Sequence, residues 1–207
     1  LNLFNLSKRN FGANEKALKA RIKSVSSIAK ITKAMKMVSS SKMRQDLARL
    51  EKGKDFGHET ISKYFKSDTY LTKRMPTNSG KTLYVPFTSD RGLCGGINSV
   101  IIREIRNTVK QNGVENSGLY IVGDKGLSAL SRAFGNIIIK GVHELSTPMN
   151  YTTAASISHD IIDSSSNFDR IVLVFNFYKS AISQEVRKIE LLTRPKFLDV
   201  TSFGKKY

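Results

Sequence analysis

Residues 82–111 read TLYVPFTSDRGLCGGINSVIIREIRNTVKQ. The first part of this segment is an apolar run with aromatic and β-branched side chains, which is typical of a strand. Residues 97–111 repeat apolar side chains at intervals of three and four, which predicts a helix. Between the two lies a turn that holds three glycines, one cysteine and an Asp-Arg pair. The segment therefore predicts a strand, a tight glycine-rich turn and a helix in succession.

The same alternation continues towards the C-terminus. Further strands are expected at 118–123, 136–142 and 170–178, helices at 125–135 and 152–166, and a fifth strand within 180–192 after a turn. Strands that alternate with helices favour a mostly parallel sheet with helices on its faces. The sequence therefore predicts an α/β fold with a five-stranded sheet.

Residues 14–66 precede this alternation and contain no proline and few turn-forming residues, which predicts one long helix. Asn14 is the expected N-cap, and Glu15 suits the positive end of the helix dipole. At ~1.5 Å per residue such a helix spans about 80 Å. Gly53 and Gly57 are the positions at which we expect it to bend or to end.

The chain accordingly divides into three parts. They are the N-terminal lead and long helix at 1–66, a polar linker at 67–81 and the α/β domain at 82–207. The first residues are basic and amphipathic, and two interpretations stay open: the mature edge of a cleaved organellar transit peptide, or a plain frayed terminus.

Two apolar stripes run along the long helix. One has the spacing of a coiled-coil seam and comprises Leu18, Ile22, Val25 and Ala29. The neighbouring stripe comprises Ile28, Ile31, Met35 and Val38, and the basic side chains between or beyond the stripes are Lys30, Lys33 and Lys36. An amphipathic core helix with a solvated basic face is the alternative, but this helix is too long for the core that the rest of the chain can build. We therefore expect it to project and to require a partner.

Charge is the strongest compositional signal. The chain has 34 Lys and Arg against 17 Asp and Glu, a formal net charge of +17. From Lys16 to Gln45 there are nine cations and no acid, so we expect no acidic partner along this interval. A segment of this kind repels itself and indicates a polyanionic partner: nucleic acid, a membrane surface or an acidic protein cavity. The apolar runs are far shorter than the ~20 residues that cross a bilayer.

The glycine-rich turn does not match the known phosphate-binding patterns. TSDRGLCGGINS fits neither GxGxxG nor GxxxxGK[ST]. Phosphate binding by glycine amides at the start of the following helix stays an alternative. Asp90 and Arg91 either pair with each other or contact a partner.

The sequence also has no spacing of side chains that is typical of a catalytic or metal-binding site. Cys94, the single cysteine, lacks a histidine at a catalytic or ligand spacing, since His58, His143 and His159 lie in widely separated segments. Asp160 and Asp163 lie one helical turn apart, the arrangement of a solvated face. We predict no catalytic residue, no metal site and no cofactor.

Two stretches resemble a known family. Residues 20–44, ARIKSVSSIAKITKAMKMVSSSKMR, are similar to the N-terminal shaft helix of the gamma subunit of F-type ATP synthase. Residues 88–99, TSDRGLCGGINS, resemble its glycine loop. Weaker similarities are IVGDKG at 121–126, FYKSAISQ at 177–184 and TSFG at 201–204. The resemblance covers almost the whole chain.

The resemblance implies a fold and a mechanical function. In the family, N- and C-terminal helices form an antiparallel coiled-coil shaft, and a Rossmann-like α/β domain lies between them near the foot. The shaft turns inside a ring of alpha and beta subunits, a membrane c-ring drives it, and proton translocation is thereby coupled to ATP synthesis. ATP chemistry belongs to the partners. The resemblance also implies contacts with small central-stalk subunits, no nucleic acid and no direct membrane insertion.

The resemblance assigns contact residues to this chain. Shaft contacts with the catalytic ring are implied for Ile28, Lys30, Ile31, Lys33, Met35, Lys36 and Val38. Glycine-loop contacts are implied for Asp90, Arg91, Gly92, Leu93, Cys94, Gly95 and Gly96. The seam of Leu18, Ile22, Val25 and Ala29 is implied to pack on the C-terminal shaft helix. The chain ends at Tyr207, before that helix, so we expect an incomplete or cleaved product, or a helix supplied by another chain.

The sequence also indicates a compartment and leaves two rival functions open. The basic N-terminal lead, without an insertion resembling the plastid regulatory cysteine segment, favours the matrix side of the mitochondrial inner membrane. The main rival is a basic nucleic-acid-binding protein with a projecting helical arm. A second rival is a nucleotide-binding enzyme on a Rossmann-like core.

Overall fold

The computed structural model describes residues 4–54, 80–180 and 182–196, with side chains in the first helix from Asn14 onward. The chain divides into two compact units, Leu1–Ser67 and Asp68–Tyr207. In these ranges no helix is both long and apolar enough to cross a lipid bilayer.

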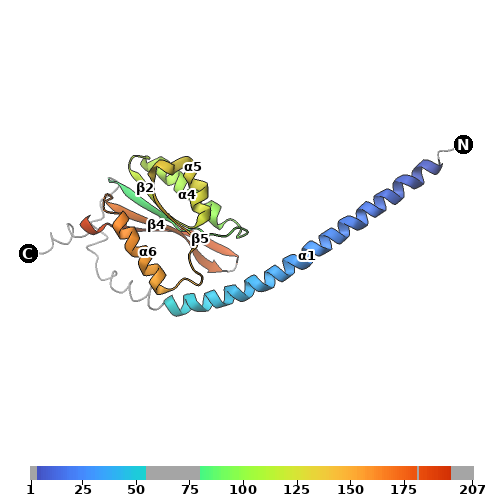
Figure 1. The fold of residues 1–207 in the computed structure, drawn as a ribbon, viewed down its shortest axis with the longest axis horizontal. Helices are drawn as coiled ribbons and strands as arrows, with labels where there is room; N and C mark the ends of the chain where they lie inside the picture. The colour runs from blue at the N-terminus through green and yellow to red at the C-terminus, as the bar shows by residue number, and fades with distance from the viewer. Residues whose placement is uncertain (1–3, 55–79, 181, 197–207) are drawn as a thin grey trace, which may run out of the picture. The chain divides into compact units, whose positions relative to one another are not determined.

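The described part of the first unit is one helix, α1, which runs from Phe4 to Lys54 (Figure 1). Its 51 residues correspond to about 75 Å at the usual rise. The prediction that Asn14 is the N-cap is wrong, because the helix begins ten residues earlier. Gly12 and Asn14 are weak helix formers, but each costs at most ~1 kcal/mol relative to alanine, too little to end a long helix. Gly53 lies inside α1, whereas Gly57 and the expected end near residue 66 lie outside the described residues.

The apolar side chains of α1 are open to solvent. Leu18, Ile22 and Val25 of the predicted seam expose 59%, 60% and 65% of their surfaces. The second stripe, Ile28, Ile31, Met35 and Val38, is exposed as well. Tertiary packing of an apolar face supplies most of the stability of protein helices, and this face has none in the described structure.

The charges of α1 make only three local ion pairs among its described side chains. Lys19 pairs with Glu15 at 2.6 Å, Arg49 with Asp46 at 2.7 Å and Lys54 with Glu51 at 3.7 Å. The expectation of no acidic partner from Lys16 onward is therefore wrong for Lys19, because Glu15 sits just before the acid-free interval, at the i,i+4 spacing. Exposed pairs of this kind contribute little. Among the side chains that the structure describes, the other cations of the interval make no ion pair.

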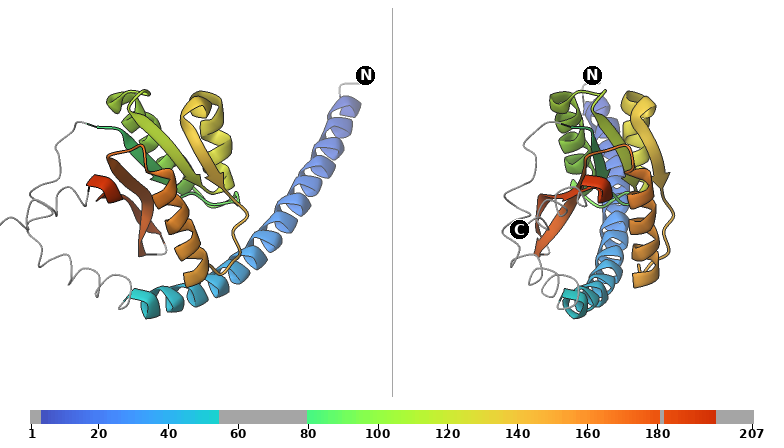
Figure 2. Two further views of the ribbon diagram at one scale, coloured as in Figure 1. Left: turned by 60° about the vertical axis from the view of Figure 1, so that its left-hand side comes forward. Right: turned by 90° about the vertical axis from the view of Figure 1, so that its left-hand side faces the viewer.

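The second unit is an α/β domain with a five-stranded sheet in the order β3-β2-β1-β4-β5 (Figures 1 and 2). Its elements are β1 (Thr82–Pro86), α4 (Ile97–Asn112), β2 (Ser117–Val122), α5 (Asp124–Phe134), the 3₁₀ turn η2 (Gly135–Ile137), β3 (Ile138–Val142), α6 (Tyr151–Ser164), β4 (Arg170–Ser180) and β5 (Ser183–Leu192). Strands β1 to β4 pair in parallel, and β5 pairs antiparallel with β4. The predicted α/β class with a mostly parallel five-stranded sheet is confirmed.

Two apolar layers hold the helices on the sheet (Figure 2). On one face, Ile101, Ile105 and Val109 of α4 and Leu130 and Phe134 of α5 pack against the strands. On the other face, α6 packs through Ile157 and Ile161. Every residue of β1 and β2 is buried, which explains why these strands read as continuous apolar runs rather than as alternating ones.

The open seam of α1 leads to a first prediction. A lone helix that buries no apolar face is marginal in water. We therefore expect amides of residues 18–45 in the isolated 207-residue chain to exchange with solvent far faster than amides of β1 and β2. A helix with a complementary seam, added in trans, should slow that exchange. Native-state hydrogen exchange measures both. Slow exchange across 18–45 in the free monomer would contradict the open-seam interpretation.

Candidate functional site

The glycine loop, residues 88–96, follows the carboxyl end of β1 and precedes α4. Its first residue, Thr88, is hydrogen-bonded to the turn between β2 and α5. The Thr88 amide donates to the Val122 carbonyl at 2.8 Å, and the Thr88 hydroxyl donates to the same oxygen at 2.9 Å. The Gly126 amide donates to the Thr88 hydroxyl at 2.9 Å. The parallel pairing of β1 with β2 thus brings two sequence motifs, at 88–99 and 121–126, into contact.

A second set of hydrogen bonds closes the loop on the start of α4. The Ser89 amide donates to Asn98 Oδ1 at 3.0 Å, and Asn98 Nδ2 donates to Ser89 Oγ at 2.8 Å and to Cys94 Sγ at 3.2 Å. Ser89 Oγ in turn donates to the Arg91 carbonyl at 2.7 Å. The Cys94 thiol therefore points into the loop, and its polar neighbours are an amide, a hydroxyl and a carbonyl. These hydrogen bonds stabilise the conformation of the loop.

Asp90 also has an internal role. Its Oδ1 accepts a hydrogen bond of 2.8 Å from the backbone amide of Asp124, the first residue of α5. A carboxylate at this place satisfies one of the free amides of a helix start and suits the helix dipole. Among the described side chains, Asp90 makes no ion pair with Arg91, so of the two readings of this pair the local one is wrong. The carboxylate is held on α5 instead.

The middle of the loop is presented to solvent. Leu93 exposes 97% of its surface and has a φ of 57°, a backbone conformation that is rare for leucine. Gly95 has a φ of 66°, which favours glycine. A Cβ added at Gly92 or Gly95 would meet nothing within 4 Å, so no internal contact requires these two glycines. Arg91 is exposed as well. An apolar side chain held out in a strained conformation is typical of a contact site.

The loop thus has an inner and an outer part. The inner part comprises Thr88, Ser89, Asp90 and Cys94, to which Asn98 of α4 is hydrogen-bonded, and the outer part comprises Arg91, Gly92, Leu93 and Gly95. The outer part offers one cation, one apolar side chain and open backbone. It can bind a surface, but it holds no acid, base or nucleophile for chemistry.

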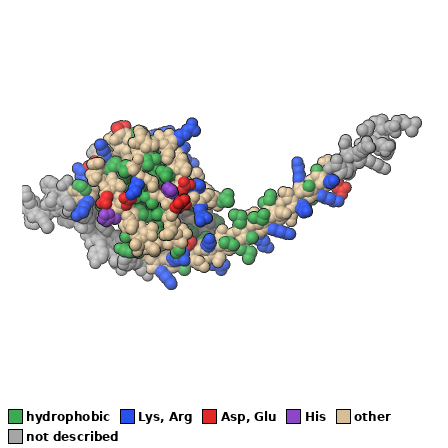
Figure 3. Space-filling model, in the orientation of Figure 1, with side chains coloured by type: hydrophobic (Ala, Val, Ile, Leu, Met, Phe, Trp, Pro, Cys, Tyr) green, Lys and Arg blue, Asp and Glu red, His purple; other side chains and the backbone are tan. Residues whose placement is uncertain are grey.

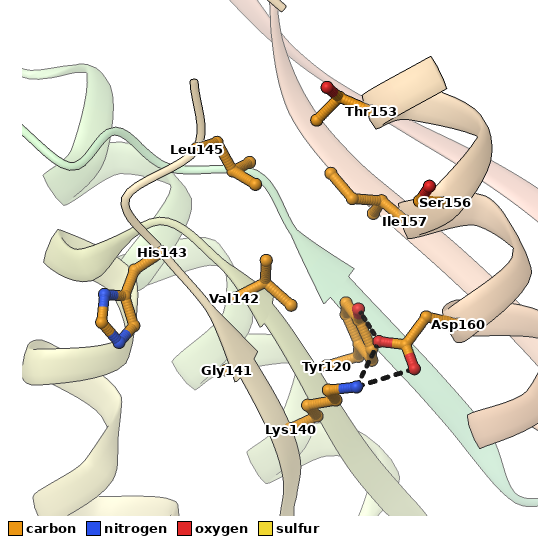
Figure 4. A pocket seen from close by; sticks show the side chains of 10 residues that line it. All are labelled: Tyr120, Lys140, Gly141, Val142, His143, Leu145, Thr153, Ser156, Ile157 and Asp160. Atoms are coloured by element: carbon orange, nitrogen blue, oxygen red, sulfur yellow. Dashed lines mark hydrogen bonds and ion pairs between the residues drawn. The ribbon is translucent and has the colours of Figure 1, made fainter. Parts of the chain in front are cut away.

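A cavity of about 520 Å³ lies between β3 and α6 (Figure 4). The Tyr120 hydroxyl donates to Asp160 inside it, and Lys140 Nζ lies 2.8 Å from the same carboxylate. Burial, and then the hydrogen bond and charge of Asp160, raise the pKa of Tyr120. The hydrogen bond from Lys140, followed by that from Tyr120, lowers the pKa of Asp160. The phenol stays protonated and the carboxylate ionised, so this network joins α6 to β2 and β3 rather than activating a nucleophile.

The predicted solvated face of α6 is therefore wrong for Asp160, which binds two partners from the sheet. Asp163 is exposed and lies 3.0 Å from His159. The His143 ring points away from the network in the cavity (Figure 4), and His58 lies outside the described residues. In the described ranges no three His, Cys, Asp or Glu side chains gather in a way that could hold a metal ion.

On α1, the lysine side chains project to solvent around the apolar stripes (Figure 3). Lys30, Lys33 and Lys36 are exposed and lie on the same helix as Ile28, Ile31, Met35 and Val38. Whether these side chains contact a catalytic ring stays a prediction. The surface itself combines unpaired positive charge with exposed apolar side chains.

Comparisons with known proteins place this architecture. A family model described as ATP synthase matches residues 14–205, which include α1 from Asn14, the glycine loop and the whole sheet. This chain belongs to the ATP synthase gamma-subunit family. The resemblance drawn from residues 20–44 and 88–99 is confirmed, and the nucleic-acid alternative finds no support.

Relatives and a solved structure agree with the family. The ATP synthase gamma chain of Rickettsia canadensis is 35% identical, over 94% of this chain and 72% of the relative. That of Geotalea daltonii is 32% identical, over 87% and 65%. The mitochondrial gamma subunit of Drosophila melanogaster is 29% identical, over 87% and 60%. This family member therefore spans about two thirds of the length of such relatives.

Among solved structures, a chain from the central stalk and c-ring of the Tetrahymena thermophila mitochondrial ATP synthase has a TM-score of 0.74 and 38% identity. The match covers 86% of this chain and 79% of that chain. The shared fold includes the long N-terminal helix and the mixed sheet.

The anchoring of the loop gives a second prediction. A Cβ at Gly123, whose φ is 101°, would overlap the Thr88 carbonyl oxygen. Gly123→Ala should therefore destabilise the domain by roughly 2 kcal/mol or more and loosen residues 88–96. Gly92→Ala is the matched control, because a Cβ there meets open space, and it should change stability by less than ~0.5 kcal/mol. Urea unfolding measures both, and equal effects would refute the anchoring.

The cavity network gives a third prediction. Because the folded-state pKa of Asp160 is lowered, its carboxylate contributes stability above the unfolded-state pKa of about 4 and loses it as pH falls through the folded value. Asp160→Asn keeps an acceptor for Tyr120 but loses the charge, so it should cost about 1 kcal/mol at neutral pH. The cost should vanish in acid. Asp163→Asn, on the exposed side, should show little effect at either pH. Thermal unfolding across pH gives the comparison.

Proposed function

We propose that this chain is the gamma subunit of the central stalk of an F-type ATP synthase. In this proposal it rotates inside the ring of alpha and beta subunits and couples proton translocation to ATP synthesis. The observation that carries the proposal is the family match over residues 14–205, in which both the basic helix and the glycine loop take part. The central-stalk origin of the similar Tetrahymena chain supports it.

The proposed role is mechanical, and α1 has the surface that it requires. A shaft that turns must make contacts which break at every step. Exposed ion pairs are worth only ~0–1 kcal/mol each and are screened beyond about a Debye length, so a row of lysines attracts acidic loops without locking one angle. Ile28, Ile31, Met35 and Val38 add modest apolar contact beside the charges. Electrostatic complementarity of this kind steers association more than it deepens binding.

The glycine loop would supply a second, more rigid contact with the ring. Arg91 suits an acidic loop of a catalytic beta subunit, and Leu93 provides an apolar anchor. Gly92, Gly95 and Gly96 let a partner backbone approach closely. Asp90 and Cys94, which the resemblance also assigned to this contact, act from inside by holding the loop in shape.

The remaining assignments follow from the same proposal. The partners are the alpha and beta subunits, the small central-stalk subunits and the membrane c-ring at the foot. The seam of Leu18, Ile22, Val25 and Ala29 would pack against a second shaft helix. The chain would work on the matrix side of the mitochondrial inner membrane, peripheral to the bilayer. Catalysis and its nucleotides belong to the ring, so this subunit needs no cofactor of its own.

A charge-removal experiment tests the shaft. Neutralising Lys30, Lys33 and Lys36 together to glutamine, in the assembled complex, should weaken coupling of ATP synthesis to proton flow severalfold, since three screened contacts add to a few kcal/mol at most. Lys30→Ala alone should change coupling less than about twofold. Proton pumping per ATP turnover is the measurement.

The control removes the same charge elsewhere. Arg103, Lys110 and Arg132 are exposed cations on α4 and α5, and their joint replacement by glutamine should leave coupling unchanged. Equal loss in both triple variants would indicate a general charge effect. Loss of assembly from Lys30→Ala alone would contradict the distributed contact.

A further inference from the structure

A second cavity, of about 350 Å³, lies between α4 and the sheet at the amino ends of β1 and β4. Thr82 and Arg170 are the first residues of those two strands. The cavity therefore lies at the amino ends of the strands, whereas the glycine loop follows the carboxyl end of β1. Its lining is mostly polar and includes Thr108 of α4 and Lys188 and Glu190 of β5. Nothing in the proposed rotor function uses this place.

Arg170 is the unusual residue of the cavity. Its side chain exposes only 11% of its surface. One guanidinium nitrogen, Nη2, donates to Thr82 Oγ1 at 3.4 Å, and Nη1 lies 3.8 Å from Glu190, both at the long end of their ranges. The buried Nε has no hydrogen-bond partner among the described residues. Buried N–H donors such as this one are rarely left without an acceptor, and the two contacts of the other guanidinium nitrogens are long.

The other charges around the cavity compensate Arg170 only in part. Lys188 Nζ pairs with Glu104 at 2.6 Å and lies 3.3 Å from the Thr108 hydroxyl. The hydrogen bond from Lys188 lowers the pKa of Glu104, so these two form a charged pair of their own. Glu190 exposes 51% of its side chain to solvent, where water competes for it. Among the described side chains, Arg170 thus has one ion pair, which is long and is made with an exposed carboxylate.

Apart from Glu190 and Val172, the side chains that line the cavity can all donate a hydrogen bond. Burial raises the pKa of the Tyr84 phenol, which therefore stays protonated. The hydroxyls of Thr82 and Thr108 and the amide of Gln111 line the same space. Donors that converge around a buried cation fit an oxyanion, with which guanidinium forms short, charge-assisted hydrogen bonds.

We propose that this cavity binds a small molecule through one oxyanion group, a carboxylate or a phosphate, held by Arg170. The volume is that of a small ligand site and exceeds the space of a single water. Water would add no negative charge to the long ion pair that the guanidinium makes with the exposed Glu190. The proposal concerns the α/β domain alone and holds whether or not the chain turns in a ring.

The test uses the 207-residue chain and two probes, inorganic phosphate for the phosphate group and citrate for the carboxylate group. The ¹H–¹⁵N resonance of Arg170 Nε reports the site directly. We expect a saturable shift of this resonance, and slower exchange of its proton, at millimolar probe with at least one of the two. Absence of a saturable shift with both probes would mean that only water occupies the cavity and would overturn the proposal.

Variants separate the site from non-specific anion binding by a basic chain. Arg170→Gln should weaken probe binding roughly ten- to hundredfold, because it removes a charged hydrogen-bond donor set. Arg132→Gln, at an exposed arginine on α5, removes the same charge and should leave binding unchanged. Equal weakening by both variants would overturn the proposal.

A second variant covers the case in which Arg170→Gln does not fold. Lys188→Gln leaves Arg170 in place and should weaken binding severalfold, because the second cation of the cavity is gone while the guanidinium contact remains. The resonance of Arg170 should still shift, at higher probe concentration. An unchanged affinity for both probes in Lys188→Gln, together with an unchanged affinity in Arg170→Gln, would refute binding in this cavity.

Discussion

The parallel pairing of β1 with β2 is the constraint on which the candidate site depends. It places the carboxyl ends of the two strands side by side, so that Thr88 reaches the Val122 carbonyl and the Gly126 amide. Asp90 then reaches the first amide of α5. Without this register the glycine-rich turn would be a loop with many conformations. With it, the inner half is hydrogen-bonded and the outer half is presented in one shape, as a partner surface requires.

The two units solve different physical problems. The α/β domain buries its apolar strands between helices and needs no partner to do so. Helix α1 exposes its seam and most of its cations, and an exposed apolar seam is stabilised only when another surface covers it. Both properties would serve the proposed rotor function: a rigid body that transmits torque, and a helix whose contacts with its surroundings are individually weak. Membership of the gamma-subunit family is consistent with this division.

Pattern reasoning succeeded where local periodicity and burial act together. The order of strands and helices, the mostly parallel sheet and the long N-terminal helix all follow from apolar spacing and turn residues. It failed at Asn14, which does not cap α1. The capping preference of one residue is too weak to end a long helix. It also failed where the partner lies far away in sequence. Asp160 looked solvated from its own helix, but Tyr120 and Lys140 reach it from the sheet. The position of a residue around its own helix does not show which side chains a neighbouring strand brings into contact with it.

The sequence by itself determined the class of fold, the basic seam-bearing helix and the family, because these depend on periodicity, composition and two specific motifs. Only the tertiary structure decided which loop residues face inward and which face a partner. It alone showed that Asp90 and Cys94 hold the loop while Arg91 and Leu93 are presented, and that Arg170 lies under-satisfied in a cavity. The physical reason is that hydrogen bonds between strand ends join residues more than thirty positions apart, and no local pattern records which of them will meet.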